Sequence, residues 1–164
     1  MPQTKSGDTL SDLENRWKED VLSLNPDVVS IFIGVNDTLG NTTYGDFDFM
    51  GWETRYRNLI KSCLSADGDC RVILCTPFFT NNGRFGNIEN FSDRSMTVKK
   101  LASIVRSLAS EYKLTLVDFA GMIEESIEKD KSSDVNYWVW DGIHPSYQAH
   151  ARMARLWERK VGRL

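Results

Sequence analysis

Cysteine and histidine are scarce in this chain of 164 residues, which contains three cysteines and two histidines. An odd number of cysteines without metal-ligand spacing argues against a disulfide-stapled scaffold and against a zinc site. Cys75 ends an apolar run, so we expect it to be a small buried hydrophobic residue. We favour free thiols for these cysteines. The alternative is a disulfide bridge between Cys63 and Cys70.

Long apolar runs and a dominant sign of charge are also absent. No apolar stretch is long enough to span a bilayer, and the net charge of −3 comes from interspersed acidic and basic residues. The sequence therefore predicts neither a nucleic-acid partner nor a membrane partner. Apolar residues make up 41% and charged residues 26%, which is typical of one globular domain spanning residues 1–164. No secretion signal is visible, and the sequence leaves the compartment open.

The apolar pattern alternates between helical spacing and short β-branched runs. We expect helices at residues 9–24, 52–63, 96–108, 120–129 and 145–161, and buried strands at 28–33, 71–75 and 114–117. Strands that alternate with helices predict right-handed crossovers and a parallel sheet covered on both faces. In such a fold a functional site lies at the carboxyl ends of the strands.

Asp141 and His144 form the most informative local pattern. They stand three residues apart, directly before Pro145, which is suited to open a helix. A turn of this length can hold one ring nitrogen of His144 against the carboxylate and leave the other nitrogen free as a general base. The alternative is that Asp141 caps the helix and His144 simply faces solvent.

Two further residues are candidate donors to a developing oxyanion. Asn36 follows the strand at 28–33 and a glycine that permits a tight turn, so its amide is held by the strand end. An ordinary Asx turn is the favoured alternative when Asn36 is taken alone. Gly7 precedes a capped helix, whose amino terminus suits an anion, and a plain helix-entry glycine is its alternative. We expect Asp37 to support the loop rather than to react.

Three other features have a functional and a structural interpretation. Residues 80–93 are a long polar loop, which is either a substrate lid or surface decoration. Trp138 and Trp140 either rim a pocket or cover the core. His150 falls on the expected apolar face of the last helix, so we expect it to be packed in the core.

Taken together, Ser6-Gly7-Asp8-Thr9, Gly34-Val35-Asn36-Asp37 and Asp141-Gly142-Ile143-His144-Pro145 resemble the blocks of the SGNH hydrolase superfamily, the GDSL-type esterases and lipases. Their order and spacing match across nearly the whole chain. The resemblance implies a flavodoxin-like three-layer α/β/α fold and ester hydrolysis without a metal or another cofactor. It implies that Gly7 and Asn36 form the oxyanion hole, that His144 is the base and that Asp141 is the acid.

The chain departs from the family pattern in one respect. The Gly-Asp-Ser block, which carries the nucleophilic serine, should precede Gly7 and is not found. We therefore expect a fold that lacks its first strand and most of its second, and no nucleophile in this chain. The strand at 28–33 would then keep an unpaired edge with exposed Val and Ile side chains, which predicts poor stability, aggregation or self-association.

The sequence thus predicts a serine esterase that acts on a small-molecule or carbohydrate ester, closer to carbohydrate acetylesterases than to lipases. We expect this chain to be inactive alone, either as a fragment of such an enzyme or, as the second interpretation, as a pseudoenzyme. The alternative function is a non-catalytic α/β binding module that holds an anionic ligand near Asn36. The acyl group, the alcohol and the assembly state are left open.

Overall fold

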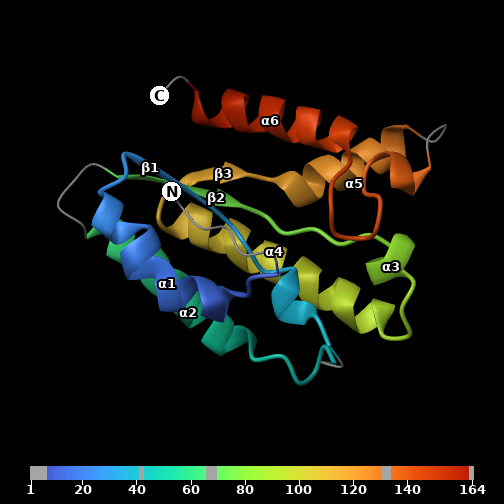
Figure 1. The fold of residues 1–164 in the computed structure, drawn as a ribbon, viewed down its shortest axis with the longest axis horizontal. Coiled ribbons are helices and arrows are strands. Elements are labelled where there is room, and N and C mark those ends of the chain that lie inside the picture. Colours follow the sequence, from blue (N-terminus) through green and yellow to red (C-terminus); the bar gives the residue numbers. More distant parts are fainter. Residues whose placement is uncertain (1–6, 41–42, 66–69, 131–133, 163–164) are drawn as a thin grey trace.

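A parallel sheet forms the centre of the computed structural model, which describes residues 7–40, 43–65, 70–130 and 134–162 (Figure 1). The strands are β1 (Val28–Phe32), β2 (Arg71–Cys75) and β3 (Thr115–Val117), and they lie side by side in the order β1-β2-β3. All pairs are parallel, with Val29 opposite Val72 and Leu74 opposite Leu116. The predicted α/β architecture is confirmed.

Helices cover both faces of this sheet. The bounds are α1 (Leu10–Asp20), α2 (Phe49–Leu64), α3 (Gly83–Gly86), α4 (Phe91–Glu111), α5 (Phe119–Lys129) and α6 (Tyr147–Val161). Short 3₁₀ turns lie at η1 (Leu22–Leu24), η2 (Asn36–Thr38) and η3 (Val135–Tyr137). α1, α2 and α4 lie on one side of the sheet, and α5 and α6 lie on the other (Figure 1). Within the described ranges, no helix is both long and apolar enough to cross a membrane.

The core consists of two apolar clusters, and β2 contributes to both. Val72 and Leu74 pack with residues of α1, α2 and α4, whereas Ile73 and Cys75 pack with residues of α5 and α6. Successive side chains of a strand point to opposite faces, so a strand between two helical layers is apolar throughout. The three-layer arrangement follows from this property of β2.

The cysteines are free thiols. Cys75 is buried, as predicted, and burial raises the pKa of this thiol to about 12. Burial likewise raises the pKa of Cys63 to about 12, and to this the neighbouring Cys70 contributes.

β1 lies at the edge of the sheet, and among the described residues only β2 pairs with it. The prediction of exposed Val and Ile side chains is wrong for Val29 and Ile31, which are buried in the core cluster that contains α1 and α2 residues. The side chains of β1 that reach the surface are those of Ser30 and Phe32. Self-association through this edge stays a prediction.

α6 presents a different face to the core than the sequence suggested. Ala149, Met153 and Val161 are buried, whereas His150 is exposed. The expectation that His150 packs in the core is therefore wrong. The small side chain of Ala149 and the flexible Met153 fit closely against the sheet, and this rotates His150 outward.

Asp118 ties the carboxyl ends of β2 and β3 to the helices around them. Its carboxylate caps α5 by accepting from the N–H of Gly121 and accepts from the hydroxyl of Thr76 at 2.7 Å. Arg106 of α4 donates to both carboxylate oxygens, at 2.8 and 3.1 Å. Burial raises the pKa of Asp118, but the bonds from Arg106, Thr76 and Gly121 outweigh it, and the pKa lies below its ordinary value of 3.8.

Arg106→Gln is expected to destabilise the fold in a pH-dependent way. Because the folded-state pKa of Asp118 is lowered, its stabilisation is present above the ordinary pKa and is lost as pH falls through the folded value. Urea unfolding should show a loss of about 1 kcal/mol at pH 7, as for a half-exposed ion pair, and a smaller loss below pH 3.8. Lys100→Gln, on the same helix, is the control. An equal loss at both pH values would contradict the assignment.

Candidate active site

Asp141 and His144 form a closed hydrogen-bonded turn. The carboxylate of Asp141 lies 2.7 Å from Nδ1 of the His144 ring and accepts from the backbone N–H of His144 at 2.8 Å and of Ile143 at 3.1 Å. Asp141 is only 3% exposed, whereas the His144 side chain is 53% exposed. The turn thus buries the carboxylate and leaves the far side of the imidazole accessible.

These contacts also set the charge of Asp141. Burial raises the pKa of the carboxyl, but the hydrogen bonds from the His144 ring and from the N–H groups of His144 and Ile143 outweigh burial and lower the pKa below 3.8. Asp141 is therefore a carboxylate at neutral pH. An ionised carboxylate beside Nδ1 keeps the proton on that nitrogen, so Nε2 is free to accept one.

The chain around this turn is constrained on both sides. Gly142 has a φ of 102°, a conformation that favours glycine, and Val139 and Pro145 form an antiparallel bridge. The Trp140 ring stacks on the His144 ring, with centroids 5.7 Å apart and an interplanar angle of 23°. The sequence left open whether Trp138 and Trp140 rim a pocket or cover the core. Trp138 is largely buried, whereas Trp140 lies at the surface beside the imidazole.

The first half of the polar loop at 80–93 is packed against the turn. The N–H of Thr80 donates to the carbonyl of Gly142 at 2.9 Å, and the N–H of Phe85 donates to the carbonyl of Asp141 at 2.8 Å. The Asn82 amide donates to the carbonyl of Val139 and, at 2.9 Å, to the side chain of Asn136. This part of the loop thus packs on the Asp141–His144 turn and supports it.

Glycines make that contact possible. A Cβ on Gly83 would lie 2.4 Å from the Cα of Asp141, and one on Gly142 would lie 2.8 Å from the backbone nitrogen of Gly86. Sequence reasoning missed Asn82 and Gly83 as residues that position the turn. The available signal was two glycines in a polar loop, and glycines are just as common in loops that support nothing.

Asn36 lies at the carboxyl end of β1, in η2. One N–H of its side-chain amide donates to the carbonyl of Asp8 at 3.0 Å. The next residue, Asp37, accepts from the N–H of Leu10 with both oxygens, at 3.1 Å each, and from the Trp52 indole at 3.1 Å. Asp37 therefore supports the loop, as expected. Burial raises the pKa of the Asp37 carboxyl above its ordinary value of 3.8, although these hydrogen bonds act in the opposite direction.

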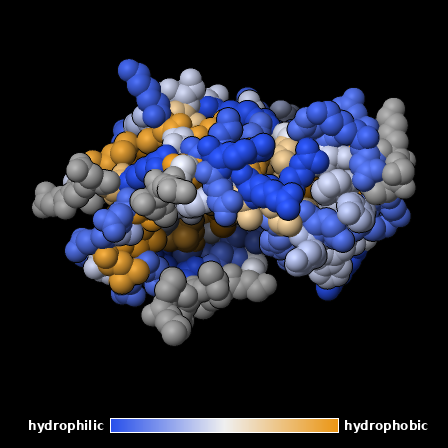
Figure 2. Space-filling view, turned by 90° about the horizontal axis from the view of Figure 1, so that it is seen from above, coloured by the Kyte–Doolittle hydropathy of each residue, from blue (hydrophilic) through white to orange (hydrophobic). Residues whose placement is uncertain are grey.

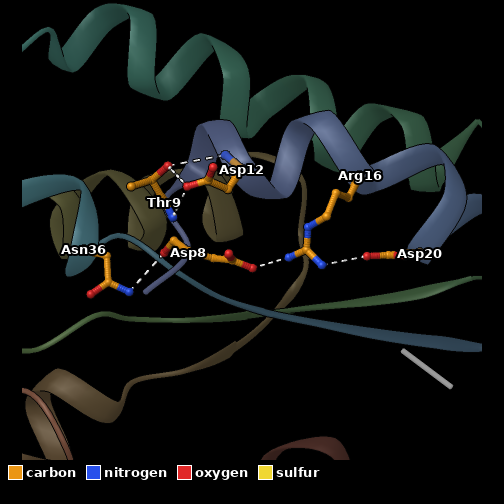
Figure 3. A network of polar contacts seen from close by, with 6 residues as sticks. All are labelled: Asp8, Thr9, Asp12, Arg16, Asp20 and Asn36. Atoms are coloured by element: carbon orange, nitrogen blue, oxygen red, sulfur yellow. Dashed lines mark hydrogen bonds and ion pairs between the residues drawn. The ribbon is translucent and has the colours of Figure 1, made fainter. Parts of the chain in front are cut away.

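Asp8, the residue after Gly7, lies against Asn36 because α1 is fixed at its amino end (Figure 3). Thr9 caps α1 in a reciprocal box with Asp12. Arg16 bridges Asp8 and Asp20, and the contact to Asp20 is 2.8 Å long. Gly7 is exposed and has a φ of 88°. These contacts hold the backbone of residues 7–9 against the Asn36 side chain.

Asn36 shares one hollow with His144 and another with Gly7. Asn36 and His144 line one pocket of about 210 Å³, together with Phe32, Gly34 and Pro77. Gly7 and Asn36 line a groove along β1. Gly7 and His144 share neither of these two hollows. The arrangement places an oriented imidazole and a side-chain amide on one pocket, and Gly7 on the hollow that adjoins it.

No nucleophile completes this pocket within the described residues. The His144 ring is hydrogen bonded to Asp141, and no serine or threonine hydroxyl of the described part of the chain is bonded to it. In those same ranges, no group of three or more His, Cys, Asp or Glu side chains is arranged to hold a metal ion.

Comparison with known proteins identifies the family. The model of the GDSL-like lipase/acylhydrolase family matches residues 3–152. An acetylxylan esterase from Geobacillus stearothermophilus is 30% identical, over 96% of this chain and 69% of the relative. The crystal structure of an acetylxylan esterase from the same organism superposes with a TM-score of 0.74 at 29% identity. A structure described as a GDSL-like lipase from Parabacteroides merdae superposes with a TM-score of 0.78 at 28% identity. These matches cover 97% and 96% of this chain and 70% of each neighbour.

The chain belongs to the GDSL-like lipase/acylhydrolase family, within the SGNH hydrolase superfamily. The predicted flavodoxin-like fold is confirmed by these structural matches.

Variants of the Geobacillus enzyme are informative about spacing. Structures described as catalytic mutants replace a serine, an aspartate or a histidine by alanine, and that aspartate precedes that histidine by three positions. Asp141 precedes His144 by the same interval. Another variant replaces the tryptophan directly before the aspartate, and Trp140 stands directly before Asp141.

Gly83→Ala is expected to displace the Asp141–His144 turn. The new Cβ would meet the Asp141 backbone at 2.4 Å, and alanine would be strained at a φ of 60°. We expect a loss of about 1–3 kcal/mol in thermal unfolding and a shifted imidazole resonance of His144 in NMR spectra. Gly45→Ala, in open space, is the control. An unchanged resonance would contradict the proposed support.

Proposed function

We propose that this chain provides the base, the acid and the oxyanion hole of a carboxylic ester hydrolase. The observation that carries the proposal is the hydrogen-bonded Asp141–His144 pair on the pocket that Asn36 also lines. Membership of the GDSL-like family and the spacing shared with the acetylxylan esterase support it.

The proposed reaction is a double displacement. A serine hydroxyl attacks the ester carbonyl and gives its proton to Nε2 of His144, while Asp141 stabilises the imidazolium that forms. The free N–H of the Asn36 amide and the backbone N–H of Gly7 donate to the oxyanion. The tetrahedral intermediate then collapses, and His144 protonates the leaving alcohol. Water, deprotonated by His144, releases the acid from the acyl enzyme.

The nucleophile is supplied, in this proposal, by a Gly-Asp-Ser segment that completes the sheet beside β1. An oriented imidazole without a hydroxyl performs no acyl transfer by this route. The substrate we propose is an acetyl ester of a carbohydrate, because the curated relative is an acetylxylan esterase and because the exposed ring of Trp140 stacks on His144.

The direct test compares two proteins with p-nitrophenyl acetate. One is this chain, and the other is this chain extended by the amino-terminal segment of the Geobacillus esterase that carries its catalytic serine. We expect hydrolysis only in the extended protein, and its loss on His144→Ala or on replacing the added serine by alanine. Loss of the nucleophile in such a unit costs on the order of a millionfold in kcat.

Two results would oppose the proposal. Activity that survives His144→Ala would remove the base from the mechanism. An extended protein that is folded, binds an acetylated saccharide and hydrolyses nothing would favour the alternative, a non-catalytic binding module.

Asn36→Ala separates an oxyanion donor from an ordinary Asx turn. In the extended protein we expect kcat to fall on the order of 10²–10³-fold, with little change in KM, as for loss of one oxyanion-hole donor. The hydrogen bond to the Asp8 carbonyl is also lost, so thermal unfolding is measured in parallel. A lower melting temperature with unchanged kcat would leave Asn36 only a structural role. Thr38→Val, in the same turn, is the control for local disturbance.

A further inference from the structure

A second hollow lies beside the site, along the outer face of α6. It has a volume of about 510 Å³ and is lined by Tyr137, Trp138, Tyr147, Arg152, Arg155 and Arg159, among others. The space-filling view looks onto this side of the molecule and shows strongly hydrophilic surface over it (Figure 2). Nothing in the proposed reaction uses this groove.

The groove begins close to the Asp141–His144 turn along the chain. Tyr147 follows His144 by three residues, so their Cα atoms are at most about 10 Å apart. Ser146 holds the start of α6 against Tyr137 and Trp138, because its N–H donates to the carbonyl of Trp138 at 2.9 Å and its hydroxyl donates to the carbonyl of Tyr137 at 2.6 Å. From Tyr147 the groove runs about 18 Å along the helix to Arg159. A polymer with one unit at His144 can therefore place neighbouring units in it.

Its charge is concentrated on one helical face. Arg152, Arg155 and Arg159 are spaced as neighbours on a helix surface. Arg152 has Glu125 at 3.8 Å, whereas no carboxylate of the described residues lies within 4.0 Å of Arg155 or Arg159. Cations near a carboxyl-terminal helix end are common because of the helix dipole, and this accounts for Arg159 but not for the mid-helix Arg152 and Arg155. In a chain of net charge −3, such a stripe suits a carboxylate ligand.

The aromatic residues add a second, independent indication of a ligand. Tyr137 and Tyr147, which line the groove, are 43% and 84% exposed. Trp138 is 8% exposed, and its buried indole N–H has no acceptor among the described residues, while Arg152 lies over its ring at 5.6 Å. Buried Trp N–H groups usually have a partner. A sugar offers both an apolar ring face and oxygen acceptors.

We propose that the α6 groove binds the carboxylate groups of an acidic polysaccharide, so that acetylated chains bearing uronic acids are the preferred substrates of the site at His144. The substrate preference rests on the proposed function, whereas the binding of carboxylates in the α6 groove does not depend on it. A nucleic acid or an anionic membrane would satisfy the arginines, but it gives no use to an aromatic surface that adjoins an esterase site.

The binding test needs no catalysis and uses the chain as it is. Affinity electrophoresis compares deacetylated glucuronoxylan with the same polymer after reduction of its carboxyl groups to alcohols. We expect about tenfold tighter binding of the acidic form, the equivalent of one or two ion pairs, and loss of this preference in Arg155→Gln/Arg159→Gln. Lys18→Gln/Lys100→Gln removes equal charge elsewhere and should keep it. Equal binding of both polymers, or equal loss in both variants, overturns the proposal.

Other polyanions and catalysis complete the test. Heparin, polyphosphate or anionic lipid vesicles bound as tightly as glucuronoxylan would show a general anion surface and overturn the uronate assignment. In the extended protein, acetate release from the acetylated acidic polymer should exceed release from its reduced form, and the arginine variant should abolish the difference. Hydrolysis without this difference overturns the proposal for the α6 groove and leaves the proposed function standing. A binding preference without any hydrolysis supports the groove and overturns the proposed function.

Discussion

The buried carboxylate of Asp141 is the constraint around which the site is organised. A carboxylate that is 3% exposed must be compensated by donors, and three of them come from the next three residues: two backbone N–H groups and the imidazole. This closes the turn and fixes the direction of the ring at once. Loss of the imidazole would leave part of a buried charge unpaired, so the same interaction that orients the imidazole also stabilises the loop.

A second carboxylate organises the opposite wall of the pocket. Asp37 joins the amino terminus of α1 to the end of β1 and to Trp52, and Asn36 is thereby held against the Asp8 carbonyl. The two walls are far apart in the sequence. They meet because parallel strands deliver their carboxyl ends to one edge of the sheet, where loops rather than side chains of the core determine chemistry.

The sequence predicts the scaffold and the two walls better than it predicts their support. β2 is apolar throughout because it is buried on both faces, and the Asp141–His144 pair is local, so both are visible as patterns. Packing of the Asn82–Phe85 segment on the turn depends on backbone groups, which carry no residue signature. The exposure of Val29 and Ile31 was wrongly predicted for a related reason: an open strand edge exposes main-chain groups, while the side chains still point into the layers above and below it.

The rotation of α6 links core packing to the surface beside His144. The apolar spacing of this helix admits more than one inward face, because Tyr147 counts as apolar in one phase and Ala149 and Met153 in another. The structure adopts the second phase, in which Ala149 and Met153 approach the sheet and Tyr147 turns outward beside the Asp141–His144 turn. The arginines of the helix then lie on that same outer side. Because inward and outward faces of one helix are fixed together, the choice of Ala149 and Met153 for the core also determines that an aromatic and cationic surface adjoins His144.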